Sequence, residues 1–169
     1  TLSIFNTTKV DGVSTLTLVA SATTGDTDYS ALYQVAATSD GKTVYSLNTV
    51  DGTLTSWQFN GTTATVLESQ TLRGANGLVL SGDGSQLYVS DSSGNVQRFA
   101  IASSGALTHI DTQSTGGSTA LAVSGSALLV VGGDSIERYS TQLSYTLGSS
   151  GIALADTLTL ADSNSDVLN

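Results

Sequence analysis

Few residues of this chain could carry out acid–base or nucleophilic chemistry. Among its 169 residues there is one histidine, His109, there is no cysteine, and there are two glutamates, Glu68 and Glu137. A catalytic base and its partner must converge on one pocket, and nothing in the spacing of these residues indicates convergence. We therefore expect His109 to be a partly exposed strand residue and both glutamates to lie on solvated strand faces. No catalytic residue is predicted, and the chain is expected not to be an enzyme.

Aspartate is the residue type best suited to bind a metal, because calcium takes closely spaced carboxylate and carbonyl oxygens. Three segments have suitable residues: Asp26-Thr27-Asp28, Asp91-Ser92-Ser93-Gly94-Asn95 and Asp162-Ser163-Asn164-Ser165-Asp166. None of them matches the EF-hand pattern or the glycine-rich nonapeptide repeat. Aspartate in a Gly/Ser turn usually caps its own backbone. We therefore predict no metal site and no cofactor, with a calcium-stiffened structural module as an alternative.

Composition restricts the partners of the chain. Fourteen acidic and five basic residues give a formal net charge of −9, which would repel a nucleic-acid backbone. No segment approaches the ~18 consecutive apolar residues of a membrane helix, so membrane insertion is not expected. A composition poor in Lys, free of Cys and rich in Thr, Ser, Gly and Asp is typical of secreted or cell-surface bacterial proteins. Because Met is absent even at position 1, we expect a segment of a longer polypeptide.

An internal repeat organises the sequence. The segment 34–45 (QVAATSDGKTVY) matches the segment 77–88 (GLVLSGDGSQLY), and a weaker copy occupies 120–129 (ALAVSGSALL). A second motif has an apolar residue three positions before an aromatic one and recurs at a similar spacing. Its copies end at Phe5, Trp57, Phe99 and Tyr139. Two motifs with one shared period indicate a structural repeat.

Each repeat is predicted to form four short strands. An apolar run comes first, an Asp-Gly turn leads into a second strand, and further Gly-rich turns precede the aromatic strand and an alternating one. No stretch has sustained helical periodicity. Four antiparallel strands in about 40–45 residues are typical of a β-propeller blade, so we predict an all-β propeller. A β-sandwich is the alternative, although it would not explain two motifs in phase.

The residues of these repeats resemble a known family. The segments SDGKTVYSLNTVDGTLTSWQF (39–59) and SGDGSQLYVSDSSGNVQRFAIASSGALTHI (81–110) are similar to the blades of lactonase-like (YVTN-type) seven-bladed propellers. The chain lacks the proline of the family's Ser-Pro-Asp-Gly turn, and the third copy replaces Asp-Gly by Gly125-Ser126. The resemblance implies a propeller fold. Members of the family include lactone hydrolases as well as surface and binding proteins.

The number of strands predicts an incomplete ring. Residues 1–161 are assigned to blades, with a half blade at 1–27 and full blades at 31–72, 74–115 and 117–160, followed by a linker or tail at 162–169. About three and a half blades cannot close alone, and open edges are normally covered. We expect the rest of a longer chain, or self-association, to complete a seven-bladed ring. A compact ring of four units is the alternative.

The resemblance also indicates where a ligand would bind. Propellers of this kind usually bind ligands where the fourth-to-first and second-to-third strand loops converge. The predicted ligand-binding residues on that face are Asp28, Tyr29, Arg73, Asn76, Asp91 and Asp134. Arg73 has an alternative role as an ion-pair partner of Asp28 or Asp111. The recurring aromatics Trp57, Phe99 and Tyr139 are expected to pack between blades.

From these features we predict a non-catalytic propeller segment of a secreted or cell-surface protein. It would act in adhesion, scaffolding or assembly through its loop face or open blade edges. Its partner would be a protein or a carbohydrate surface ligand. A lactonase-like hydrolase fragment and the calcium-stiffened module are the alternatives.

Overall fold

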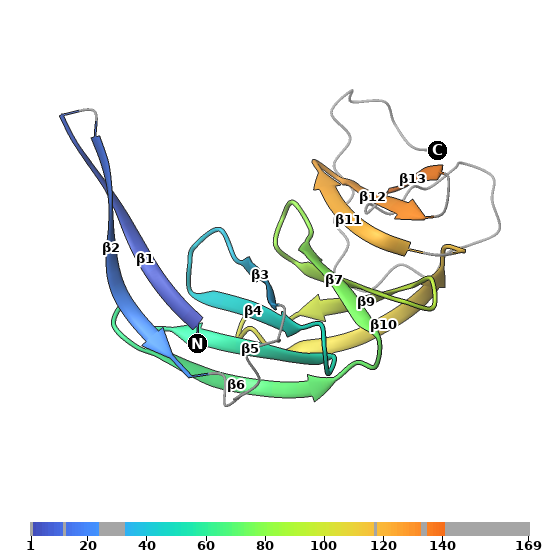
Figure 1. The fold of residues 1–169 in the computed structure, drawn as a ribbon, viewed down its shortest axis with the longest axis horizontal. Coiled ribbons are helices and arrows are strands. Elements are labelled where there is room, and N and C mark those ends of the chain that lie inside the picture. The colour runs from blue at the N-terminus through green and yellow to red at the C-terminus, as the bar shows by residue number, and fades with distance from the viewer. Residues whose placement is uncertain (1, 12, 24–32, 117, 133–134, 141–169) are drawn as a thin grey trace, which may run out of the picture.

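The structure, a computed structural model, describes residues 2–11, 13–23, 33–116, 118–132 and 135–140. In these ranges the chain forms thirteen β-strands (Figure 1). No helix in the described ranges is long and apolar enough to cross a membrane. The strands are β1 (Leu2–Val10), β2 (Val13–Ala22), β3 (Tyr33–Ala37), β4 (Thr43–Asn48), β5 (Thr53–Phe59), β6 (Ala64–Thr71), β7 (Ala75–Leu80), β8 (Gln86–Asp91), β9 (Asn95–Ile101), β10 (Leu107–Ser114), β11 (Ser118–Ser124), β12 (Ala127–Gly132) and β13 (Ser135–Ser140).

The strands form four antiparallel sheets that follow one another along the chain. Two sheets are complete four-stranded blades, β3-β4-β5-β6 and β7-β8-β9-β10, whereas β1-β2 is a hairpin and β11-β12-β13 has three described strands. The first strands of neighbouring sheets, β3, β7 and β11, contact one another. The sheets follow an arc, with the β1-β2 hairpin at one end and β11-β13 at the other (Figure 1). The prediction of an all-β partial propeller is confirmed.

Two predicted segments cannot be placed in this arc. The fourth strand of the blade expected at 117–160 falls largely on residues outside the described ranges. The predicted linker or tail at 162–169 lies outside them as well.

Side-chain caps hold the predicted Asp-Gly turns. One Asp83 carboxylate oxygen accepts hydrogen bonds from the Ser81 hydroxyl at 2.6 Å and from the Ser85 amide at 3.0 Å. Gly84 has a φ of 72°, a left-handed conformation that most side chains disfavour. The turn at Asp40-Gly41 repeats this arrangement. The turn residues therefore fix the register of the first two strands in both complete blades.

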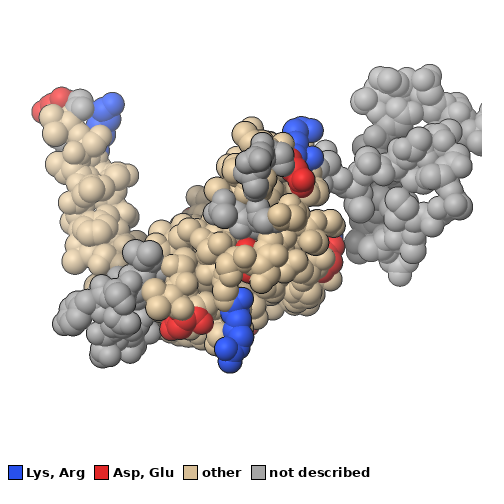
Figure 2. All heavy atoms as spheres, turned by 45° about the vertical axis from the view of Figure 1, so that its right-hand side comes forward, with Lys and Arg blue, Asp and Glu red and all other residues tan. Residues whose placement is uncertain are grey.

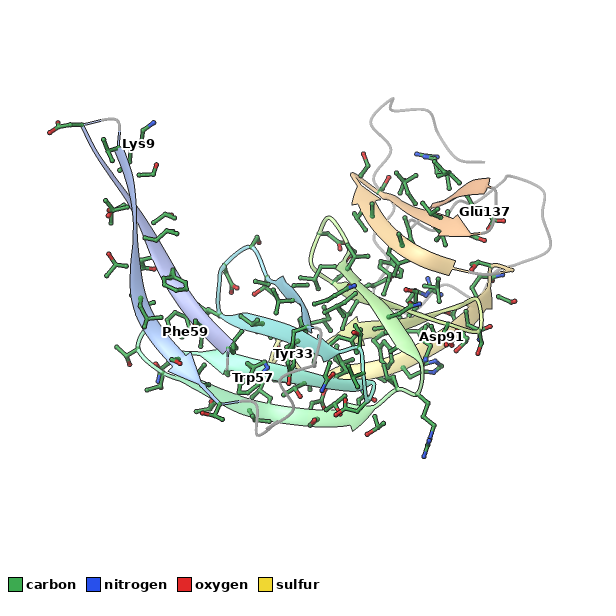
Figure 3. The ribbon with its side chains drawn as sticks, viewed as in Figure 1. Lys9, Tyr33, Trp57, Phe59, Asp91 and Glu137 are labelled. Atoms are coloured by element: carbon green, nitrogen blue, oxygen red, sulfur yellow. The ribbon has the colours of Figure 1, made fainter. Side chains whose placement is uncertain are left out.

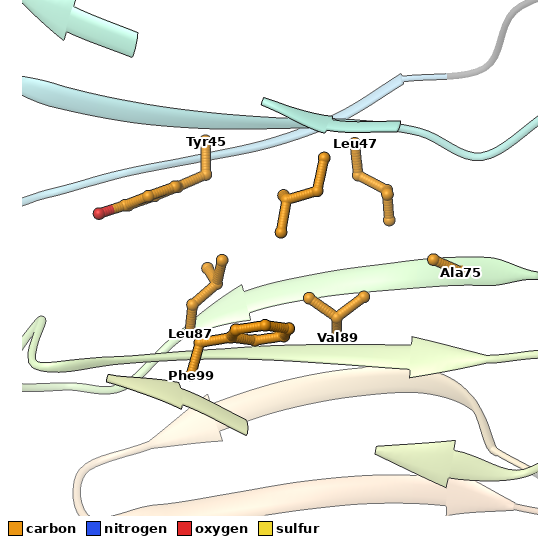
Figure 4. Packing of buried hydrophobic residues seen from close by; sticks show 7 residues of the cluster. Tyr45, Leu47, Ala75, Leu87, Val89 and Phe99 are labelled. Carbon is orange, nitrogen blue, oxygen red and sulfur yellow. The ribbon is translucent and has the colours of Figure 1, made fainter. Parts of the chain in front are cut away.

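The largest apolar core lies between the two complete blades. Its side chains come from facing surfaces of the two sheets and are almost fully excluded from solvent (Figure 4). They are Tyr45, Leu47 and Leu54 from one sheet and Ala75, Leu87, Val89 and Phe99 from the next. Since β4 is buried along its whole length, each blade buries apolar residues on both of its faces.

The recurring aromatic of each blade faces the preceding sheet. Phe99 packs into the core just described, and Trp57 packs against Leu2 of the hairpin. Tyr139 packs against the cluster around Tyr88. The prediction that these aromatics pack between blades is confirmed. Trp57 also donates its indole N–H to the Ser46 hydroxyl at 2.8 Å, so its polar atom is satisfied in the core.

A bulge recurs beside the aromatic in each described outer strand pair. In each case the outermost strand has one extra, unpaired residue: Val19 in β2, Leu67 in β6 and Ile110 in β10. The adjacent pair contains the recurring aromatic: Phe5 with Leu18, Trp57 with Val66 and Phe99 with His109. The β1-β2 hairpin therefore has the geometry of the third and fourth strands of a blade. The bulge therefore identifies equivalent residues in the three sheets independently of the sequence motifs.

Tyr45 provides a test of the contact between blades. Its hydroxyl donates to the carbonyl of the buried Gly105 in the next blade at 3.0 Å, and burial raises the pKa of Tyr45 to about 12. Tyr45→Phe should lower the free energy of unfolding by about 1–3 kcal/mol, because the carbonyl loses its partner. The measurement is chemical denaturation. Tyr88→Phe is the control and should cost less, since its acceptor is the Gln86 side chain, which water can reach.

Asp83 provides a test of the turn caps. Hydrogen bonds from the Ser81 hydroxyl, and from the Ser85 amide and hydroxyl, lower the pKa of Asp83 from 3.8 to about 2. A lowered pKa in the folded state stabilises the fold above the unfolded value and loses this effect as the pH falls toward 2. The melting temperature of Asp83→Asn should therefore be lower than that of the wild type at pH 6, and the two should converge near pH 2. A difference that stays constant from pH 6 to pH 2 would contradict this account.

Candidate functional site

The candidate site lies on the edge of the sheets formed by the β4-β5, β6-β7, β8-β9 and β10-β11 connections, here called the loop face. Its described residues are 49–52, 72–74, 92–94 and 115–116. Three predicted ligand residues, Asp28, Tyr29 and Asp134, lie outside the described residues, so their role stays a prediction.

Backbone hydrogen bonds tie the loop face together. The Leu72 amide donates to the Gly52 carbonyl at 2.8 Å, and the Thr115 amide donates to the Gly94 carbonyl at the same distance in the next blade. Gly52 has a φ of 76°, and a Cβ there would lie 2.1 Å from the Leu72 carbonyl oxygen. Glycine is thus required where the two loops meet. Within each complete blade the connections at this edge are therefore hydrogen-bonded to one another, an arrangement that can support side chains of a site.

Asp91 is bound to its own turn. Its side chain accepts hydrogen bonds from the backbone amides of Ser93 at 2.8 Å and Asn95 at 3.0 Å, and it is largely buried. This is the cap expected for an aspartate in a Ser/Gly turn. These hydrogen bonds leave the Asp91 carboxylate with few unused acceptor positions. Whether Asp91 also contacts a ligand stays a prediction.

Arg73 and Asn76 lie close together at the junction of β6 and β7. Asn76 is half-buried, and its side-chain oxygen accepts a hydrogen bond from the Ser90 hydroxyl at 2.8 Å. Arg73 is exposed, and within the described ranges the single ion pair is Arg98–Asp111. Asp111, an expected alternative partner of Arg73, thus pairs with Arg98 instead. Arg73 is thus a cation on the rim with no ion pair to another described residue, and its pairing with Asp28, which lies outside the described ranges, stays a prediction. A guanidinium of this kind suits an anionic or hydroxyl-rich ligand.

The inner strands are joined by a residue that the sequence analysis missed. The Gln34 side chain on β3 donates to the Asn76 carbonyl at 2.8 Å and accepts from the Leu78 amide at 2.9 Å. These two groups belong to the free edge of β7, the first strand of the next blade. Gln34 therefore pairs the open edge of one blade with its neighbour and fixes the backbone that carries Asn76. No local pattern marks it, because its partners are 42 and 44 residues away.

A second candidate is a pocket of about 170 Å³ between the β7-β10 and β11-β13 sheets. Arg98 and Asp111 line it as a bidentate pair, with Nε–Oδ1 at 3.0 Å and Nη2–Oδ2 at 2.5 Å. A guanidinium already neutralised by a carboxylate is poorly placed to bind another anion. The volume is also below the 300–1,000 Å³ typical of small-molecule sites. We therefore take the loop face as the candidate site.

His109, Glu68 and Glu137, the other candidates for acid–base chemistry, each contact another described side chain or backbone group. His109 is exposed on β10, as predicted, with its ring edge against Phe99 at 5.4 Å between centroids. The solvated position expected for Glu68 is wrong, because its carboxylate is half-buried and accepts from the Leu107 amide of the next blade at 2.6 Å. Glu137 is also half-buried and accepts a hydrogen bond from the Tyr139 hydroxyl, which corrects its solvated assignment. In each case a neighbour beyond the reach of local sequence supplies the partner.

Charged groups do not gather into a metal-binding cluster in the described part of the chain. No group of three or more His, Asp or Glu side chains there could hold a metal ion. On the face shown in Figure 2, acidic and basic side chains are scattered over a mostly uncharged surface. The segments 26–28 and 162–166, considered as alternatives for calcium, lie outside the described residues, so the expectation of no metal site is not tested there.

Gln34 provides a test of how the loop face is held. Gln34→Ala should lower the free energy of unfolding by about 1 kcal/mol, because both bonds to the edge of β7 are lost. The amide of Leu78 should also exchange with deuterium faster than in the wild type, while amides of β8 stay protected. Gln113→Ala is the control, since among the described residues the hydrogen bond of this side chain goes to the neighbouring Ser114 carbonyl. Unchanged exchange at Leu78 would show that Gln34 does not secure this edge.

The strand arrangement is similar to that of several solved propellers. A candidate 6-phosphogluconolactonase from Bacteroides fragilis matches with 25% identity and a TM-score of 0.58, over 63% of this chain and 34% of that one. The periplasmic gluconolactonase of Pseudomonas aeruginosa matches with 23% identity and a TM-score of 0.55, with the same two coverages. A second candidate 6-phosphogluconolactonase, from Bacteroides uniformis, matches with 19% identity and a TM-score of 0.62, over 82% of this chain and 44% of that one.

The chain therefore spans between a third and a half of the length of these structures. No protein-family model matches this sequence, and no curated protein matches it. The likeness to lactonase-like propellers is thus carried by the structures, and the narrower YVTN-type assignment is not shown.

These similarities correct one expectation from the sequence. The absence of a convergent catalytic group led to the prediction that the chain is not an enzyme, and that prediction is wrong in the light of the gluconolactonase names of its structural neighbours. The physical reason is that local spacing cannot detect residues brought together from separate blades. The described chain has the fold of lactonase-like propeller proteins.

Proposed function

We propose that this chain is part of a lactonase-like hydrolase whose substrate is a sugar lactone bound at the loop face. The observation that carries the proposal is the similarity to the Bacteroides fragilis protein, which combines 25% identity with a TM-score of 0.58. The chain covers 34% of that protein, so the full active site would include residues from further blades.

The chemistry of the loop face is compatible with such a substrate. In lactone hydrolysis, water adds to the ester carbonyl, the ring C–O bond breaks, and the ring oxygen takes a proton to give a hydroxy acid. Negative charge develops on the carbonyl oxygen, so a fixed cation or N–H donor beside it lowers the barrier. Arg73 is an exposed cation on the rim, and we assign it to binding the carbonyl oxygen or an anionic substituent of the sugar. We expect the water-activating base among the predicted loop-face carboxylates, Asp28 and Asp134.

We also propose that this hydrolase works outside the cytoplasm. The Pseudomonas aeruginosa neighbour is named as a periplasmic protein. The absence of cysteine and the acidic, Lys-poor composition agree with an extracytoplasmic location.

The test is the hydrolysis of gluconolactone and of its 6-phosphate, followed by acid release and corrected for the spontaneous reaction. Arg73→Ala should lower kcat/KM by about 10- to 100-fold, as expected for the loss of one charged hydrogen bond. A larger loss with the phosphorylated lactone would place Arg73 at the phosphate. Equal losses with both lactones would place it at the ring carbonyl.

Lys9→Ala is the matched control, because it removes one cation from the tip of the β1-β2 hairpin, far from the loop face (Figure 3). It should leave kcat/KM unchanged. Because the full active site would include further blades, the assay uses the complete protein that contains this chain. A wild-type rate of that protein no faster than the spontaneous reaction with either lactone would overturn the proposal.

A further inference from the structure

The sequence contains two Asn-Gly pairs, Asn60-Gly61 and Asn76-Gly77, which lie in very different surroundings. In such a pair the backbone nitrogen of the glycine can attack the carboxamide carbon of the asparagine, because glycine has no side chain to obstruct the approach. The attack requires a carboxamide that lies over the following peptide and a glycine that is free to move. The structure shows which of the two pairs meets these conditions.

Asn60-Gly61 lies in the exposed connection between β5 and β6. The side-chain oxygen of Asn60 accepts hydrogen bonds from the backbone amides of Thr62 at 3.0 Å and Thr63 at 2.9 Å, and from the Thr62 hydroxyl at 3.1 Å. A bond to the amide two residues later folds the carboxamide back over the peptide that joins Asn60 to Gly61. The carboxamide carbon therefore lies next to the nitrogen of Gly61.

The same turn favours the reaction electronically and leaves room for it. Negative charge develops on the carboxamide oxygen during the attack, and the three donors on that oxygen stabilise it. Gly61 has a φ of 100°, and no atom lies within 4 Å of the position that a Cβ would take. Among the described residues no acceptor binds the Gly61 amide. This blade has a described sheet on each side, so the exposure of its turn does not depend on blades beyond them.

Asn76-Gly77 contains the same two residues in a fixed strand. Gly77 is buried and pairs with Ser90 of β8, and a Cβ at Gly77 would lie 2.2 Å from the Ser90 hydroxyl. The Asn76 side-chain oxygen accepts from that hydroxyl at 2.8 Å, and the Asn76 carbonyl accepts from the Gln34 side chain at 2.8 Å. Attack at Asn76 therefore requires β7 to open first.

We infer that Asn60 is a site of spontaneous covalent modification, at which the turn converts through a succinimide to aspartate and isoaspartate, whereas Asn76 is protected. The Gly61 nitrogen gives its proton to a base in the solvent and bonds to the Asn60 carboxamide carbon. The bond from that carbon to the side-chain nitrogen breaks, and the nitrogen takes up a proton and leaves as ammonia. Water then opens the ring at either carbonyl, which gives aspartate or isoaspartate.

The modification would add one carboxylate to the edge of the sheet opposite the loop face, since the β5-β6 connection lies at the other end of the strands from the β4-β5 connection. The aspartate product keeps an acceptor for the amides of Thr62 and Thr63, as Asp83 has for the Ser85 amide. The isoaspartate product adds one carbon to the main chain of the turn. This inference does not depend on the proposed hydrolase activity.

The experiment incubates the complete protein that contains this chain in mildly alkaline buffer and follows it by tryptic peptide mapping with mass spectrometry. Cleavage after Lys42, Arg73 and Arg98 places the two Asn-Gly pairs on separate peptides, 43–73 and 74–98. Peptide 43–73 should gain about 1 Da, as a carboxylate replaces a carboxamide, at least about tenfold faster than peptide 74–98. A smaller ratio, or no gain in peptide 43–73, would overturn the inference.

Incubation in urea tests whether the fold sets this difference. In the unfolded chain neither pair keeps its hydrogen bonds, so the two peptides should gain mass at similar rates. A ratio that stays the same in urea would assign the difference to local sequence and overturn the role of the turn.

Asn60→Asp is the matched control variant, because it removes the reacting carboxamide and keeps an acceptor for the turn. Its peptide 43–73 should gain no mass, whereas a gain at the wild-type rate would assign the reaction to Asn48, the other asparagine of this peptide. In the wild type, the modified peptide should separate by chromatography into two species of equal mass, since the succinimide opens at either carbonyl. A single species would indicate direct hydrolysis by water and would overturn the attack by the Gly61 nitrogen.

Discussion

The structure depends on the fact that a blade of this protein buries apolar side chains on both of its faces. All six residues of β4 are buried, and alternate residues point to the preceding and the following sheet. Burial of apolar area is the main favourable term in folding, at roughly 25 cal/mol per Å². Each face of a blade supplies only half of an apolar core, and the neighbouring blade supplies the other half. A single blade therefore gains the free energy of apolar burial only by stacking on its neighbours. The positions of the described candidate residues on the loop face follow from that stacking.

The two complete blades are joined by different interactions at their inner strands, in the middle of the sheets and at their outer strands. At the inner edge Gln34 bonds the free edge of β7, in the middle Phe99 fills the apolar core, and farther out Glu68 accepts from the Leu107 amide. Apolar packing supplies most of the adhesion and tolerates small displacements. The polar bonds at either side are directional and set the distance and angle between the sheets. The position of Arg73 on the loop face therefore depends on residues of two blades.

The sequence predicted what is encoded locally. The Asp83-Gly84 turn, the alternating strands and the recurring aromatics each depend on residues within one repeat, and all were predicted. Gln34, Glu68 and the Arg98–Asp111 pair were missed or assigned to solvent, because their partners lie on another strand or in the next blade. Asp91 was noticed in the sequence, but its role could not be decided, because an aspartate serves equally well as a turn cap and as a ligand residue. Convergence of side chains from several blades is likewise beyond the reach of local spacing, so the spacing alone gave no ground for predicting that the chain is not an enzyme.

The recurring bulge has a consequence for the outer rim of the molecule. The outermost strands β2, β6 and β10 have an unpaired edge in the described sheets, and they carry exposed apolar residues such as Val66 and Ile110. A straight apolar edge would offer a template for strand addition by any unfolded chain. The extra residue at Val19, Leu67 and Ile110 bends each of these strands near its middle and interrupts its regular pleat. An outer edge interrupted in this way is a poorer template for strand addition than a straight apolar strand would be.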